Sequence, residues 1–383
     1  MALSKITITE INGASRFLTS DDSKSGMLFY VSDTSALAET SFQVYSLQEA
    51  ETAGVTVDDF PVAHYHIDEF YRMSDSAQLQ VKFVSYTGGT HDFAEVKELV
   101  ADADGDMSQI GVYTQANFST GMVTALQAVM SDLKEEDDIP LVSLLQANFS
   151  GVTLSSLSDL SSSNAPQVAV LLGQDGGGTG AALYNSIGKS IGILGAALGS
   201  LSVSSVHESI AWKGQYDVSG AELNTLAFAN GTPYKSVSKS QLATLNDKKY
   251  IFLLKDFGLN GSYFNSSFVA TQESSDYYSL ERGRVINKSR KLLRTSLLPQ
   301  LNSPLYLEES GSLRLETIGK FTSLAEQGLQ GMLRAGELSN YSVYIDPAQD
   351  VLASDTLVID VKLQPVGVSR YINITLGFAV SLA

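Results

Sequence analysis

The chain has 383 residues, which allows two or three domains and a sizeable core. Hydrophobic residues make up 44%, charged residues only 17%, and the mean hydropathy is +0.04, which excludes a chain disordered throughout. The formal net charge of −17 disfavours bulk nucleic-acid binding, and the lack of cysteine excludes disulfides and thiolate metal sites. Because no apolar run suits a signal peptide or a membrane span, we expect a soluble protein that stays in the cytosol without membrane insertion.

The first stretch of the chain predicts a strand followed by a domain boundary. Residues 5–9, KITIT, alternate apolar and polar side chains, and this places Ile6 and Ile8 on one face of a half-buried strand. The polar stretch 20–26, SDDSKSG, indicates a loop. We therefore expect a second domain to begin near residue 22.

The middle of the chain mixes strand and helix patterns. MLFYVSD and LQVKFVSY favour strands, and residues 121–134 favour a helix. QVAVLLGQDGGGTG is typical of a buried strand that ends in a glycine-rich loop. IGKSIGILGAALGSLS then predicts a helix whose small residues permit close packing against a neighbour. This alternation predicts a mixed α/β (α+β) fold.

The sequence HYHID gives one candidate metal site. On a strand, His64, His66 and Asp68 would share a face, which is a possible spacing for metal ligands. The chain has only four histidines and no motif that fixes a third imidazole. We therefore favour structural strand histidines, and keep a metal-dependent enzyme or ligand-binding protein as a remote alternative.

Two further motifs fall short of known ligand sites. Gly188-Lys189-Ser190 matches the end of a phosphate-binding loop, but Leu183 stands where its first glycine is needed. The triplet Asp102, Asp104 and Asp106 opens like a calcium loop, but Tyr113 replaces the closing glutamate. We therefore expect no catalytic residue, no metal, no cofactor and no enzymatic activity.

The most regular pattern of the chain is an amphipathic helix from Val285 to Leu297. At about 100° per residue, one arc of this helix is apolar. That arc holds Val285, Ile286, Leu292, Leu293 and Leu297. The rest of the cylinder carries five cations, Arg284, Lys288, Arg290, Lys291 and Arg294. Such a basic face indicates either docking to an acidic partner or a solvated surface, and the segment alone favours neither.

The charge of the chain is unevenly distributed. Residues 281–383 carry 11 Lys and Arg against 10 Asp and Glu, so residues 1–280 carry 14 against 32. Nearly all the acidity therefore lies before the basic helix.

The last part of the chain predicts one more helix and three strands. The helical pattern runs from Ile318 to Arg334, and SVYID, TLVIDVKLQ and RYINITLGFAVSLA favour strands. The apolar positions of the last segment alternate with polar or small ones. They include Ile372, Ile374, Leu376 and Phe378.

These C-terminal segments resemble the tail sheath proteins of contractile bacteriophages and related injection systems. The resemblance is closest to a sheath-like family found in prophages. It rests on ERGRVINK, LLPQLNSP, IDPAQDVLAS and PVGVSRYINITLGF, which together span most of residues 276–380. The segments YHIDEFYR and SIGKSIGILGAALGSLSVSSVHESIAW are also similar to that family.

The resemblance implies an inner sheath domain built from residues 1–21 and 266–383, with a mixed sheet, helices and terminal linking strands. It implies an inserted outer α/β domain of residues 22–265, formed as one unit or as two subdomains. The subunits would form a helical homopolymer around an inner tail tube, in the tail of a virion assembled in the cytoplasm of a bacterial host. Contraction would drive the tube through a target envelope. Implied further partners are baseplate and tail terminator proteins.

The resemblance also assigns roles to two residue sets. The basic helix face of Arg284, Lys288, Arg290, Lys291 and Arg294 would contact the tube. The terminal strands would exchange between subunits, with Ile6, Ile8, Ile372, Ile374, Leu376 and Phe378 as the apolar contacts. Pairing of the two termini within one subunit remains an alternative, as does the sheath of a bacterial injection system that is not a virion.

Overall fold

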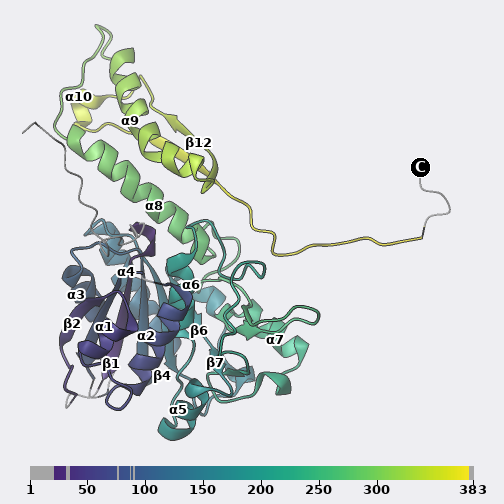
Figure 1. Ribbon diagram of the computed structural model, residues 1–383. Coiled ribbons are helices and arrows are strands. Elements are labelled where there is room, and N and C mark those ends of the chain that lie inside the picture. Colours follow the sequence, from purple (N-terminus) through teal and green to yellow (C-terminus); the bar gives the residue numbers. More distant parts are fainter. Residues whose placement is uncertain (1–20, 32–34, 76, 87, 89–90, 379–383) are drawn as a thin grey trace, which may run out of the picture.

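The computed structural model of the chain describes residues 21–31, 35–75, 77–86, 88 and 91–378 (Figure 1). The predicted strand with Ile6 and Ile8 lies outside these residues. We use three names below. The N-terminal body is the described part of residues 21–279, the C-terminal body is residues 280–365, and the arm is residues 366–378.

The N-terminal body is organised around a seven-stranded sheet with the order β2-β3-β1-β4-β5-β6-β9. All its pairings are parallel except that of β2 with β3, which is antiparallel. The strands are β1 (Ser25–Val31), β2 (Thr40–Val44), β3 (Leu79–Ser85), β4 (Gln109–Asn117), β5 (Val142–Asn148), β6 (Val168–Leu171) and β9 (Tyr250–Ile251). Both faces are covered, which explains the continuous apolar runs of the central strands.

Helices form a layer on each face of this sheet (Figure 1). One layer contains α1 (Leu47–Thr52), α2 (Pro61–Met73) and α6 (Leu194–Val203). The other contains α3 (Glu95–Asp102) and α4 (Thr120–Glu135).

Smaller elements complete the N-terminal body. They are α5 (Thr179–Ile187), α7 (Lys239–Asp247), the antiparallel pair β7 (Gly173–Asp175) and β8 (Leu226–Phe228), and the antiparallel pair β10 (Leu253–Leu254) and β11 (Tyr263–Phe264). Short 3-10 helices lie in this body at Asp21–Ser23, Leu154–Ser156, Leu160–Ser163 and Tyr234–Ser236, and in the C-terminal body at Leu298–Gln300. Mixed α/β content agrees with the predicted fold class.

The predicted small-residue helix is confirmed as α6, which crosses closely under α2. A Cβ atom at Gly195 would lie 2.0 Å from the backbone oxygen of His66, and one at Gly199 would lie 2.6 Å from that of Phe70. Only glycine permits this approach of two backbones.

The histidine motif lies on α2, so its predicted strand is wrong. Pro61 occupies the first turn, a position that proline favours, and the buried side chains then recur with a helical period through Ala63, Ile67 and Phe70. The alternation in HYHID is too short to outweigh this longer pattern.

The C-terminal body consists of two long helices, one short helix and a hairpin. They are α8 (Leu280–Leu297), α9 (Leu315–Arg334), β12 (Leu338–Tyr344), the short helix α10 (Val351–Ser354) and β13 (Asp360–Pro365). Both predicted helices and the first two predicted strands are confirmed. The strands pair antiparallel, with Val343 opposite Val361, and pack with α8 and α9 around a small core that includes Leu329 and Met332.

The third predicted strand is not formed in the single chain. The arm contains no helix or strand and runs away from both bodies beyond its first residues (Figure 1). A strand is defined by hydrogen bonds to a partner strand, and none of the described residues supplies one to the arm.

Candidate assembly surfaces

The basic face of α8 packs on the N-terminal body of the same chain. Arg284 is 3% exposed, and its guanidinium donates to Ser204 Oγ at 2.8 Å and to the backbone oxygens of Ser204 and Ser205 at 3.0 and 3.3 Å. Burial lowers the pKa of Arg284 to about 10, so it remains a cation at neutral pH. The expectation of an outward-facing side chain is wrong for this residue.

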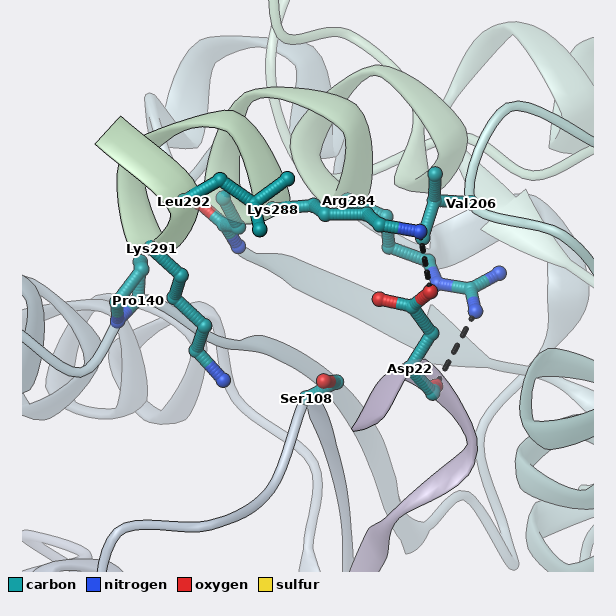
Figure 2. Close-up of a pocket in the computed structure, with 9 residues that line it drawn as sticks. Asp22, Ser108, Pro140, Val206, Arg284, Lys288, Lys291 and Leu292 are labelled. Carbon is teal, nitrogen blue, oxygen red and sulfur yellow. Dashed lines mark hydrogen bonds and ion pairs between the residues drawn. The ribbon is translucent and has the colours of Figure 1, made fainter. Parts of the chain in front are cut away.

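Lys288 connects α8 to two carboxylates from distant parts of the chain. Its Nζ lies 2.6 Å from Asp22 Oδ2 and 2.7 Å from Glu337 Oε1. Burial opposes the charge of Lys288, but the hydrogen bonds to both carboxylates outweigh it and raise the pKa. Figure 2 shows Asp22 between Lys288 and Arg284, beside a cleft of ≈ 240 Å³ between α8 and the N-terminal body. Lys291 extends across this junction and donates to the backbone oxygen of Met107 at 2.7 Å.

Arg290 and Arg294, the last two cations of the basic face, form ion pairs with the acidic turn at the end of α4. Arg294 Nε lies 2.9 Å from Asp138 Oδ2. Arg290 lies 3.4 Å from Asp138 Oδ1 and 3.6 Å from Glu135 Oε1. Hydrogen bonds from Arg294 and Arg290 lower the pKa of Asp138. The acidic partner of this helix face is therefore, in the single chain, its own N-terminal body.

The expected apolar anchor of α8 is present. Val285 is buried, and Leu292 and Leu293 pack beside it against α9 and the hairpin. The two faces of α8 thus hold the two bodies together, the basic face on one and the apolar face on the other. Arg290 and Arg294 keep 33% and 45% of their side-chain surface exposed.

The arm and the hairpin carry unused strand-pairing capacity. The four predicted contact residues of the arm, Ile372, Ile374, Leu376 and Phe378, are each at least 76% exposed. The hairpin has only two strands, so β12 and β13 each keep one edge without a partner among the described residues. An isolated two-stranded sheet is marginal in water, and open edges are templates for pairing with another chain.

The candidate metal ligands do not converge. His66 is buried, donates from Nε2 to the backbone oxygen of Ile191 at 3.1 Å, and accepts at Nδ1 from the Gly195 amide. Burial lowers its pKa to about 3. His64 faces Glu51 instead, at 2.8 Å. No three His, Asp or Glu side chains in the part of the chain that the structure describes are grouped to hold a metal ion.

The other two motifs are explained by local structure. Gly188 ends α5 in a left-handed conformation, and the hydroxyl of Ser190 accepts from the Phe149 amide at 2.7 Å. Asp102 pairs with Lys82 at 3.0 Å, and Asp106 pairs with Lys24. These side chains stabilise turns and strand ends. Within the described residues, no helix is both long and apolar enough to span a membrane.

Sequence reasoning missed the residues that partner the basic helix. Asp22, Asp138 and Glu337 are separated from it along the chain, and no local pattern marks them. It also missed Arg370, which lies next to the alternating apolar run but contacts Ser266 of the N-terminal body and Glu281 at the start of α8.

The solved structures most useful for comparison are contractile sheath proteins. The helical sheath of the anti-feeding prophage in its contracted state has a TM-score of 0.66, 14% identity and complete coverage of both chains. The contracted PVC sheath complex of an extracellular contractile injection system has a TM-score of 0.63, 11% identity and coverage of 99% of this chain and 98% of that one. A sheath tail protein from Desulfitobacterium hafniense has a TM-score of 0.55, 8% identity and coverage of 94% and 100%.

These likenesses show that the chain has the sheath fold. None of the curated proteins compared with it matches. Two family models match, one for the DUF2586 N-terminal domain over residues 3–268 and one for the DUF2586 C-terminal domain over residues 276–383. The chain therefore belongs to the DUF2586 family.

Proposed function

We propose that the chain is the structural subunit of a contractile tail sheath, which polymerises helically around an inner tail tube and contracts to drive that tube through a target envelope. The observation that carries the proposal is the exposed, alternating apolar side of the arm, in a chain whose hairpin keeps open edges. The sheath fold agrees with a structural, non-catalytic role.

Strand donation explains why the arm is left unpaired. An extended segment adds to an open sheet edge through backbone hydrogen bonds, and its alternate side chains enter pockets of the acceptor. Each subunit carries one arm and one hairpin, so a contact in which each subunit donates to the next forms an open helical assembly. The predicted N-terminal exchange through Ile6 and Ile8 remains part of this proposal.

We propose that the C-terminal body belongs to the inner domain and that most of the N-terminal body forms the outer domain. The family models divide the chain between residues 268 and 276, close to the proposed boundary at residue 265. We assign residues 266–383 to the inner domain at the tube, together with residues 1–21, and residues 22–265 to the outer domain.

We limit the proposed contact between sheath and tube to two of the five cations of α8. Arg284 could meet a tube only by leaving its buried partners, and Lys288 and Lys291 are engaged with the N-terminal body. We therefore place the tube contact at Arg290 and Arg294, which keep exposed surface at the end of α8. Exposed ion pairs contribute about 0–1 kcal/mol each, which suits a contact that repeats many times and must release during contraction.

The remaining partners follow from this assembly. The subunit binds further copies of itself, and a baseplate and a tail terminator meet the two ends of the sheath. For a phage, its location is the virion tail, assembled in the host cytoplasm. The sheath of a bacterial injection system is the second candidate, favoured by the similarity to the anti-feeding prophage and PVC structures. Neighbouring genes for a capsid and a terminase would favour the phage.

Deletion of residues 371–383 tests strand donation. We expect folded monomers with an unchanged melting temperature that form no striated tubes by negative-stain microscopy and no pellet on ultracentrifugation. A finer comparison replaces Ile374 and Leu376 by lysine, with the neighbouring pair Asn373 and Thr375 replaced by lysine as the matched control. Sheaths of normal length from the truncated chain would contradict the proposal.

A further inference from the structure

The base of the arm is fastened by one arginine to the junction between the N-terminal body and the start of α8. Arg370 donates from its two terminal nitrogens to Ser266 Oγ at 2.9 Å and Ser267 Oγ at 3.1 Å, and it pairs with Glu281. Its guanidinium also lies 4.9 Å from the centre of the Phe268 ring and 5.4 Å from that of Tyr278. The side chain is 15% exposed, whereas the residues after it are almost fully exposed.

The site that receives Arg370 needs a cation. Glu281 is a buried carboxylate in the first turn of α8, and it also accepts from Ser267 Oγ at 2.6 Å. Among the described residues, Arg370 supplies its ion pair. A buried carboxylate without a counterion is strongly destabilising, so this ion pair holds the base of the arm at the start of α8. Ser267 Oγ lies 2.9 Å from Ser209 Oγ, which extends the polar cluster into the body.

The fastening changes where the arm begins. The hairpin ends at Pro365, so residues 366–369 cross from the C-terminal body to the N-terminal body before Arg370 docks. Beside this crossing lies a groove of ≈ 820 Å³, bordered by Trp212, Phe268 and Val368. The free part of the arm therefore starts on the N-terminal body rather than at the end of β13.

Without this fastening, the nearest acceptor for the arm would be its own hairpin. Four residues, 366–369, match the usual length of a hairpin loop, and Gly367 lies within them. The free edge of β13 would then face the apolar arm of the same chain. Such pairing is intramolecular and would compete with donation to another subunit at a high effective concentration.

We propose that Arg370 is a positioning residue that holds the arm away from its own hairpin and directs it to a second copy of this chain. The proposal rests on strand donation between subunits as the assembly mechanism. It assigns to the Arg370–Glu281 pair the choice between self-pairing and polymerisation.

The first test measures assembly. Arg370→Gln removes the charge and the ion pair, and we expect the critical concentration for polymerisation to rise about tenfold, the effect expected if self-pairing leaves about one arm in ten free to be donated. Arg370→Lys keeps the charge but loses the planar set of guanidinium donors, and we expect an intermediate critical concentration. Arg282→Gln is the matched control, because Arg282 lies over Tyr278 beside the site without an ion pair to Glu281. We expect it to assemble normally.

The second test measures the arm itself in dilute monomers. The chain has no cysteine, so spin labels can be placed at the exposed positions Lys362 and Asn373 through two introduced cysteines. We expect the distance between the labels to shorten in Arg370→Gln as the arm folds onto β13, and to stay long in the Arg282→Gln control.

The outcomes separate the two proposals. If the wild-type chain polymerises and Arg370→Gln has the same critical concentration and the same label distance, the proposed role of Arg370 is overturned. A wild-type chain that never polymerises would overturn the sheath function, whereas the label distances would still report on the fastening. If Arg370→Gln fails to fold, Arg370→Lys carries the same comparison, and equal assembly and distances for that variant and the wild type would count against the proposal.

Discussion

His66 is kept as a neutral imidazole mainly by its burial, which lowers the pKa to about 3. Nε2 donates to the Ile191 oxygen, and Nδ1 accepts from the Gly195 amide, so a second proton would set two donors against each other. The hydrogen bond to the Ile191 oxygen favours the protonated ring and raises the pKa, but burial outweighs it. The residue that could have been a metal ligand is therefore a connector between α2 and the start of α6.

This arrangement predicts a loss of stability in acid. The folded pKa lies below the usual value near 6.5, so the unfolded chain takes up the proton first as the pH falls. The contribution is complete above about pH 6.5 and decreases by up to about 1.4 kcal/mol per pH unit toward pH 3. His66→Gln should flatten this part of the curve of unfolding free energy against pH, measured by urea denaturation.

The control for this prediction is His64→Gln, the same change on the side of α2 that faces Glu51. It should leave the slope nearly unchanged. Some slope will remain in His66→Gln, because burial also lowers the pKa of His91. Equal slopes for the two variants would show that His66 does not carry the acid sensitivity.

At the scale of elements, α2 and α6 cross with their backbones in close contact at Gly195 and Gly199. Gly195→Ala places a methyl group against the backbone of α2, which cannot give way as a flexible side chain can. We expect a loss of about 3 kcal/mol or more in unfolding free energy by chemical denaturation. Gly319→Ala in α9, where a Cβ meets no atom within 4 Å, should instead stabilise the chain by about 0.5–1 kcal/mol. An unchanged unfolding free energy in Gly195→Ala would contradict the close packing of α2 against α6.

Elements with strong local periodicity could be predicted from the sequence. The helix predicted over 285–297 appears as α8, extended to Leu280, because its apolar arc is long and proline follows it. The hairpin strands were predicted for the same reason. The HYHID strand failed because an alternation of five residues also fits one side of a helix. The RYINITLGF segment is strand-like by composition, but its state depends on a partner strand that the single chain does not provide.

Only one side of the contact between α8 and the N-terminal body could be predicted from the sequence. The basic residues of α8 lie on consecutive turns of one helix, so they form a pattern. Their partners Asp22, Asp138 and Glu337 are joined to them only by the fold. Arg370 has no pattern at all, since its role depends on where Ser267 and Glu281 lie in space.

At the scale of the whole molecule, the charge asymmetry has two possible uses that one experiment separates. Arg290→Glu with Arg294→Glu should abolish co-sedimentation of the sheath with the tube. The same change also breaks the pairs with Asp138, so the loss alone is ambiguous. Adding Asp138→Arg restores opposite charges within the chain and leaves the outward charges reversed.

We expect the triple variant to remain unable to bind the tube, although its melting temperature returns toward that of the wild type. Recovery of tube binding in the triple variant would mean that these arginines act only between the two bodies of the chain. The measurement needs folded sheath and tube mixed at low ionic strength, because exposed charges are screened within about 10 Å at 0.1 M salt.

Under the proposed strand donation, the unpaired arm would also give the polymer a direction. In a row of subunits that each donate one strand forward, every internal arm is accepted and every internal hairpin is filled. One end of the row would then present a hairpin edge with no strand bound to it. The other end would present an apolar arm with no sheet edge to pair with. The proposed proteins at the two ends would therefore need opposite features, one a free strand and the other an open sheet edge, and we expect that neither could substitute for the other.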